Sequence, residues 1–140
     1  MKYVLDASVA VKWVLPEDDS PLAETLRDRI IAGDIDAVAP DTFPVEIAHA
    51  LTRAERRGTI PVGQASLGVR LILLDGPNVQ PYLPLLPRAV ELSSQKRIGV
   101  YDSLYVALAE ELDCELITAD AKLVSAFPKL TCVVLLSDLS

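Results

Sequence analysis

The chain opens with Met1-Lys2-Tyr3-Val4-Leu5-Asp6-Ala7-Ser8, an apolar segment followed at once by polar residues. Its β-prone residues, Tyr3 to Leu5, predict a strand that ends directly at an acid. In an open α/β sheet, ligands bind outside the carboxyl ends of the strands. Asp6 ends what we expect to be the first and central strand, so it lies where a functional site is expected.

Strands and helices alternate along the rest of the chain. Strands are predicted at residues 2–6, 36–39, 78–80, 114–118 and 132–136. Helices are predicted at residues 8–15, 20–33, 42–58, 62–74, 87–97, 101–112 and 121–127. This alternation predicts an α/β fold with a mostly parallel sheet and covering helices. No repeat, linker or low-complexity segment divides the sequence, so we expect a single domain over residues 1–140.

Composition and charge narrow the classes of protein. Hydrophobic residues make up 51% of the chain, which argues against a disordered protein, and no apolar run reaches the roughly 18 residues of a membrane span. We expect no secretory signal. The two cysteines, Cys114 and Cys132, are expected to be buried free thiols. Together these features predict a cytoplasmic protein without membrane contact. A formal net charge of −7 argues against broad adhesion to nucleic acid. Any polyanion must therefore meet a local basic patch or a bound metal ion.

Four of the twenty acids stand beside strongly apolar segments, whereas most of the others fall in turns or at helix ends. Asp6 and Asp120 follow predicted strands. Glu46 and Asp102 lie near the starts of apolar helices. Strand ends and the helix starts that follow them share one edge of a parallel sheet, so these four can converge although 40, 56 and 18 residues separate them in turn.

Each acid also has a simple structural explanation. Asp102 and Asp120 are good N-cap residues, and Asp6 is placed to cap the helix that begins at Ser8. Glu46 benefits from the positive end of a helix dipole. These explanations hold for one acid at a time, whereas the sharing of one edge by all four favours a common function.

Four carboxylates in one pocket repel each other, and some take up protons unless a cation is bound. Oxygen ligands suit Mg²⁺ or Mn²⁺. Zinc is disfavoured, because His49 is the single histidine and the two cysteines lack the spacing of a zinc site. Carboxylate-bound metals support phosphodiester hydrolysis, in which one ion activates water and a second, about 3.5–4 Å away, stabilises the leaving oxygen. The four acids therefore predict metal-assisted phosphodiester cleavage.

Taken in order, these motifs resemble the PIN domain, in particular the small toxin ribonucleases of bacterial and archaeal VapBC toxin–antitoxin pairs. The resemblance covers nearly the whole chain. It consists of Tyr3-Val4-Leu5-Asp6-Ala7-Ser8, Pro40 to Leu51 with Glu46 inside it, Tyr101-Asp102-Ser103-Leu104 running into Ala107, and Leu116-Ile117-Thr118-Ala119-Asp120.

The resemblance implies a three-layer α/β/α fold with a five-stranded parallel sheet, and a metal-dependent endoribonuclease. It implies that Mg²⁺ or Mn²⁺ is held by Asp6, Glu46, Asp102 and Asp120, which are also the catalytic residues. Ser8 and Thr118 match small hydroxyl residues that orient carboxylates or water, although both also suit local turn or cap bonding. RNA cleaved to 3′-hydroxyl and 5′-phosphate ends, a homodimer and inhibition by a small antitoxin are also implied.

Other functions remain open at this point. A catalytically weak PIN-fold interaction protein would keep the acids without turnover. A phosphotransfer domain would use Asp6 as a strand-terminal nucleophile, but position 8 holds a serine where such phosphatases need a second acid. A dinucleotide-binding module is excluded because no glycine precedes Gly33. Three explanations are open for the cluster Arg53, Arg56 and Arg57: contacts to RNA, contacts to an antitoxin, or a solvated helix end where cations are favoured. The solvated helix end is the favoured explanation.

Overall fold

The computed structural model describes residues 1–128 and 132–139, and its centre is a parallel β-sheet. In this part of the chain the sheet has five strands in the order β3-β2-β1-β4-β5. The strands are β1 (Lys2–Leu5), β2 (Asp36–Pro40), β3 (Asn78–Gln80), β4 (Glu115–Thr118) and β5 (Val133–Leu135). The predicted five-stranded parallel sheet is confirmed, with β1 at its centre.

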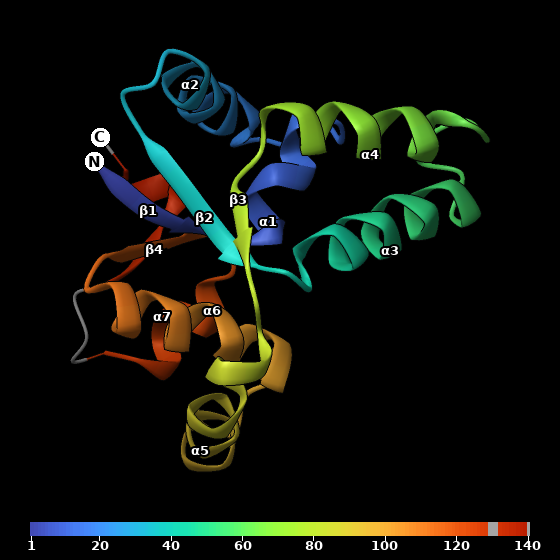
Figure 1. Ribbon diagram of the computed structural model, residues 1–140. Helices are drawn as coiled ribbons and strands as arrows, with labels where there is room; N and C mark the ends of the chain where they lie inside the picture. The colour runs from blue at the N-terminus through green and yellow to red at the C-terminus, as the bar shows by residue number, and fades with distance from the viewer. Residues whose placement is uncertain (129–131, 140) are drawn as a thin grey trace.

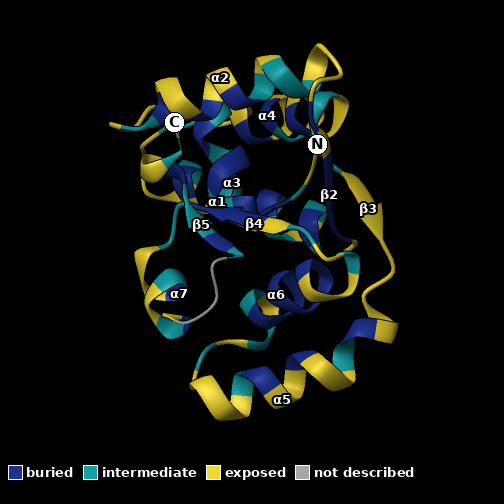
Figure 2. Ribbon diagram, turned by 90° about the vertical axis from the view of Figure 1, so that its left-hand side faces the viewer, coloured by how far each residue is buried: buried dark blue, intermediate teal, exposed yellow. Residues whose placement is uncertain are grey.

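Helices cover both faces of this sheet. The longer ones are α2 (Ser20–Ile31), α3 (Phe43–Arg56), α4 (Gln64–Asp75), α5 (Leu86–Lys96) and α6 (Val100–Leu112), and the short ones are α1 (Ala7–Ala10) and α7 (Ala121–Ala126). Short 3₁₀ segments occur at Val11–Trp13, Leu83–Leu85 and Leu136–Asp138. Helices α1 to α4 lie on one face and α5 to α7 on the other, as Figures 1 and 2 show from two directions. The arrangement is a three-layer α/β/α fold.

The first helix differs from its prediction. The sequence predicts one helix over residues 8–15, whereas the structure has the four-residue α1 followed by the 3₁₀ segment Val11–Trp13. Valines disfavour a long helix because their branched side chains crowd the preceding turn, and the residue before a proline avoids helical geometry. The indole nitrogen of Trp13 donates a 2.8 Å hydrogen bond to the carbonyl of Ala23. This bond anchors the chain where the helix ends.

Helix α6 is the most buried helix of the fold. It lies between the sheet and α5, and Figure 2 shows it largely in the colour of buried residues. Every residue from Ser103 to Ala109 is buried, which explains why this helix is apolar on all sides. The buried apolar residues form one continuous cluster with those of the strands. That cluster supports a single domain over residues 1–140, which stays a prediction.

Helix α4 presents its leucines to solvent. The leucine spacing predicts the helix correctly, but Leu67, Leu71 and Leu74 are 50%, 44% and 78% exposed. The buried side of α4 carries Ala65, Gly68 and Ile72 instead. A Cβ atom at Gly68 would lie 3.0 Å from side-chain atoms of Leu51 and Val14, so the small residue permits close packing on α3. None of the described helices is long and apolar enough to cross a membrane.

Candidate active site

A cavity of about 250 Å³ lies at the carboxyl edge of the sheet, and all four acids singled out from the sequence line it. Asp6 comes from the end of β1, and Asp120 lies two residues beyond the end of β4. Glu46 and Asp102 come from the first turns of α3 and α6. The remaining lining residues are Ala7, Ser8, Val11, His49 and Ala50.

Two hydroxyl groups hold the carboxylate of Asp6. Oδ2 of Asp6 accepts hydrogen bonds from Oγ of Ser8 at 3.0 Å and from Oγ1 of Thr118 at 2.7 Å. Both hydroxyl oxygens also accept backbone N–H groups, Ser8 from Ala119 and Thr118 from Asp120, each at 3.0 Å. Ser8 and Thr118 therefore orient Asp6 and close the turn after β4 at the same time.

Asp6 is buried, with an exposed fraction of 4%. Burial raises the pKa of this carboxyl group because the charged form loses its hydration. The hydrogen bonds from Thr118 and Ser8 lower it, and the negative charge of Asp120 raises it. A cation near Asp6 would offset the burial and the charge of Asp120, and would favour the ionised carboxylate.

Glu46 is half-buried and is held from two sides. Its Oε2 accepts a 2.8 Å hydrogen bond from the hydroxyl of Tyr105 and a 3.2 Å bond from Oγ1 of Thr42. Burial is the largest of the effects that raise the pKa of Glu46 to about 7. The negative charges of Asp6 and Asp102 act in the same direction. Glu46 therefore changes protonation near neutral pH when no cation is bound.

Asp102 and Asp120 behave differently from each other. Burial, together with the charges of Asp6 and Asp120, raises the pKa of Asp102 to about 6. Its helix, α6, is capped at Gly99, so capping does not explain Asp102. Asp120 is the N-cap residue of α7, and its Oδ1 accepts a 2.9 Å hydrogen bond from the backbone N–H of Lys122. Asp120 accordingly combines the capping role with a position in the cavity wall.

The chemistry of this cavity suits a hard divalent cation. The four acidic side chains offer only oxygen ligands, and a positive ion between them would offset the burial and the mutual repulsion that raise the pKa values of Asp6, Glu46 and Asp102. As they stand, no three His, Cys, Asp or Glu side chains of the described residues are grouped closely enough to hold a metal ion.

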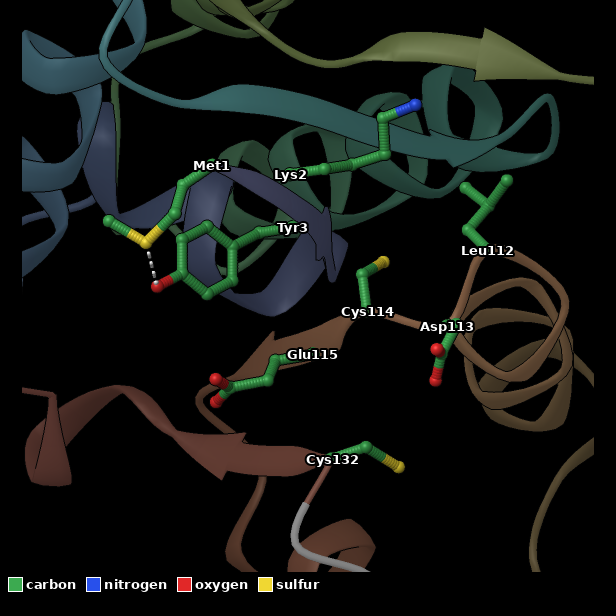
Figure 3. A pocket seen from close by; sticks show the side chains of 8 residues that line it. All are labelled: Met1, Lys2, Tyr3, Leu112, Asp113, Cys114, Glu115 and Cys132. Atoms are coloured by element: carbon green, nitrogen blue, oxygen red, sulfur yellow. Dashed lines mark hydrogen bonds between the residues drawn. The ribbon is translucent and has the colours of Figure 1, made fainter.

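A larger cavity, of about 540 Å³, lies at the opposite, amino-terminal end of β1 and β4 (Figure 3). Cys114 and Cys132 line it, and both are free thiols, half-buried where the sequence predicts them buried. Burial raises the pKa of each thiol, which favours the protonated, less nucleophilic form. The acids of the carboxyl edge do not reach this cavity.

Comparison with models of known domain families identifies the family of this chain. The model of the PIN domain matches residues 3–127. This chain belongs to the PIN domain family. The match confirms the resemblance recognised in the sequence.

Curated relatives of this PIN domain are named as ribonucleases. Ribonuclease VapC3 of Pyrobaculum aerophilum is 32% identical over 132 residues, which cover 93% of this chain and 98% of that protein. Ribonuclease VapC1 of Mycobacterium tuberculosis is 39% identical over 101 residues, covering 67% and 69%. Ribonuclease VapC12 of the same organism is 34% identical over 121 residues, covering 86% and 88%.

Solved structures show the same PIN fold. The crystal structure of PAE2754 from Pyrobaculum aerophilum has a TM-score of 0.72 at 19% identity and covers 98% of this chain and 93% of that one. VapBC2 from Rickettsia felis, bound to a DNA fragment from its promoter, has a TM-score of 0.67 at 14% identity and covers 96% and 97%. These likenesses establish the fold of this PIN domain.

Sequence reasoning missed the two hydroxyl groups that hold Glu46, those of Tyr105 and Thr42. Tyr105 of this PIN domain lies inside the apolar run of α6, where it reads as an ordinary core residue. Its spacing of three from Asp102 was the available signal, because residues three apart share a helix face. His49, the single histidine of the chain, is exposed and also lines the cavity.

Proposed function

We propose that this PIN domain is a metal-dependent endoribonuclease, a hydrolase acting on phosphodiester bonds, and the toxin component of a toxin–antitoxin pair. One observation carries the proposal: Asp6, Glu46, Asp102 and Asp120 line a single cavity at the carboxyl edge of the sheet. Curated relatives with the names of VapC ribonucleases support the same activity.

In this proposal Mg²⁺ or Mn²⁺ binds among the four carboxylates of Asp6, Glu46, Asp102 and Asp120. A bound ion would act as a Lewis acid that lowers the pKa of water and stabilises negative charge on the phosphate. Ser8 and Thr118 keep Asp6 in one orientation, because both hydroxyl groups bond to its Oδ2.

Glu46 is the residue best suited to move a proton. Tyr105 and Thr42 both bond to Oε2, and no described side chain donates a hydrogen bond to Oε1. Oε1 is therefore placed to accept a proton from the attacking water, the role of a general base. Attack by water on the phosphodiester, with departure of the 3′ oxygen, leaves 3′-hydroxyl and 5′-phosphate ends.

The test is cleavage of single-stranded RNA with Mg²⁺ or Mn²⁺, repeated with EDTA and with the variants Asp6→Asn and Asp102→Asn. We expect activity only in the wild-type protein with metal. Full activity in EDTA, or in both variants, would overturn the metal mechanism. RNA that is bound but never cleaved would favour the alternative, a PIN-fold interaction protein without turnover.

We propose a small antitoxin protein as a partner, and a second copy of the chain as another. The fold neighbour from Rickettsia felis is a VapBC pair, which supports the first. The exposed leucines of α4, Leu67, Leu71 and Leu74, form an apolar surface of the kind that a protein partner covers. Light scattering after gel filtration tests for the dimer, and co-purification with the product of an adjacent short reading frame tests for the antitoxin. With RNA as its substrate, we place the protein in the cytoplasm.

A further inference from the structure

A further cavity, of about 290 Å³, adjoins the acid-lined one along helix α3. His49 and Ala50 line both cavities, so the two share a wall. This further cavity is also lined by Arg53 and Arg57, both exposed. We call it the basic cavity; its remaining lining residues are Leu15, Ala54 and Thr59.

Helix geometry places the two arginines in line with the acid-lined cavity. Glu46, Ala50, Arg53 and Arg57 follow one another at spacings of four, three and four residues, which keeps them on one face of the helix. At 1.5 Å per residue, Arg53 lies about 10 Å and Arg57 about 16 Å beyond Glu46 along the helix axis. Figure 1 shows α3 leading away from the carboxyl ends of the strands. The arginines therefore lie outside the reaction centre.

Arg53 and Arg57 form no ion pair with an acidic side chain of the described residues. Among the described residues, Lys2, Lys12, Arg27 and Arg88 each pair with an acid, whereas neither arginine of the basic cavity does. Arg29, Arg56, Arg70, Lys96, Arg97 and Lys122 also form no such pair among the described residues, so the cavity, and not the missing ion pair, distinguishes Arg53 and Arg57. The dipole of α3 explains why cations are favoured near its last turn. It does not explain why they line a cavity that shares its wall with the four acids.

We propose that the basic cavity binds backbone phosphates of the substrate RNA that flank the cleaved bond. This inference rests on the proposed ribonuclease function. Arg53 and Arg57 supply the phosphate contacts, since the guanidinium group matches phosphate oxygens in a two-pronged geometry. In this proposal the acid-lined cavity binds the phosphate that reacts, and the basic cavity binds the phosphates of the neighbouring nucleotides. The two arginines offset the repulsion between RNA and this negatively charged chain.

The experiment measures RNA cleavage and RNA binding as functions of salt concentration. Variants Arg53→Gln and Arg57→Gln are compared singly and together with the wild type on a single-stranded RNA oligonucleotide. Each lost contact should reduce the slope of log K against log salt by about 0.7, so that the double variant loses about 1.4. A charge-assisted hydrogen bond to phosphate predicts a fall in kcat/KM of about tenfold per arginine at low salt.

A matched control is Arg29→Gln, because Arg29 lies near the end of α2, outside both cavities. It changes the net charge equally and should leave the slope unchanged. Arg57→Lys keeps the charge without the two-pronged geometry, so its kcat/KM should lie between the values of the wild type and Arg57→Gln.

The outcomes separate this proposal from the ribonuclease proposal. A wild-type protein that cleaves no RNA would contradict the proposed function itself. Normal cleavage with an unchanged salt slope and kcat/KM in the double variant would overturn the phosphate subsite alone. If that variant keeps its RNA affinity but loses affinity for an antitoxin protein, the basic cavity is a protein-binding surface and not an RNA subsite.

Discussion

The hydroxyl of Tyr105 donates a 2.8 Å hydrogen bond to Oε2 of Glu46 and thereby joins helices α6 and α3 across 59 residues of sequence. Tyr105 is fully buried and Glu46 is half-buried. Water therefore has little access to replace this donor. The carboxylate of Glu46 is held in one orientation by the core of the molecule, so the core and the candidate active site are coupled at this bond.

Replacing Tyr105 with phenylalanine should lower RNA cleavage by about 10- to 100-fold, the usual cost of losing a hydrogen bond that orients an active carboxylate. The ring still fills its place in the core, so the free energy of unfolding should fall by only about 1 kcal/mol. Initial cleavage rates and urea unfolding measure the two effects. The matched control is Tyr101→Phe on the same helix, at a residue that is 58% exposed, and it should change neither. Full activity in Tyr105→Phe would show that the bond has no orienting role.

The positions of the four acids could be predicted because each stands beside a strongly apolar segment. Asp6 follows Val4 and Leu5, and this pattern fixes both the strand and the point where it ends. The bonds that hold the acids are harder to predict. The apolar pattern around Tyr105 shows that it is buried, but not that its hydroxyl contacts a residue on another helix.

In the fold, too, the periodicity of the sequence predicts the helices, whereas packing determines which side of a helix is buried. The leucine spacing of α4 predicts a helix, yet the side that packs on α3 is set by Gly68 and its neighbours. Likewise, the sequence predicts that Arg53 and Arg57 are exposed. Their cavity could not be predicted, because Leu15 and Thr59 close it from other parts of the chain.

Thr118→Val should destabilise the protein by about 1–3 kcal/mol at pH 7, because a buried carboxylate, Asp6, loses its 2.7 Å donor. The backbone N–H of Asp120 loses its acceptor as well, so cleavage should also slow. Urea unfolding followed by circular dichroism measures the change. Thr25→Val is the control, since Thr25 is exposed on α2 and bonds only to the carbonyl of Pro21 within its own helix. A loss in Thr118→Val no larger than in the control would show that the bond to Asp6 contributes little.

Glu46 predicts how stability depends on pH in the metal-free protein. Its pKa is about 7 in the folded state against an ordinary value of 4.5, so folding favours its protonated form. The stabilisation is complete below about pH 4.5 and is lost as the pH rises through about 7. Asp102, with a pKa of about 6, acts in the same direction. The free energy of unfolding in EDTA should therefore fall between pH 5 and pH 8, and it should fall less in Glu46→Gln. Equal slopes in the two proteins would contradict this origin.

Substituting Asp102 should stabilise the metal-free protein and weaken the stabilisation that a bound metal ion provides. Asp102→Asn removes one of the repelling charges in the cavity, so the metal-free variant should melt at a higher temperature than the metal-free wild type at pH 7.5. Mn²⁺ should stabilise the wild type, by about 2.7 kcal/mol at a hundred times Kd, because the ion binds only the folded state. The variant should lose most of that response. Asp28→Asn, an exposed change on α2, should leave both measurements unaltered. A variant that melts lower without metal and still responds fully to Mn²⁺ would show that Asp102 takes no part in cation binding.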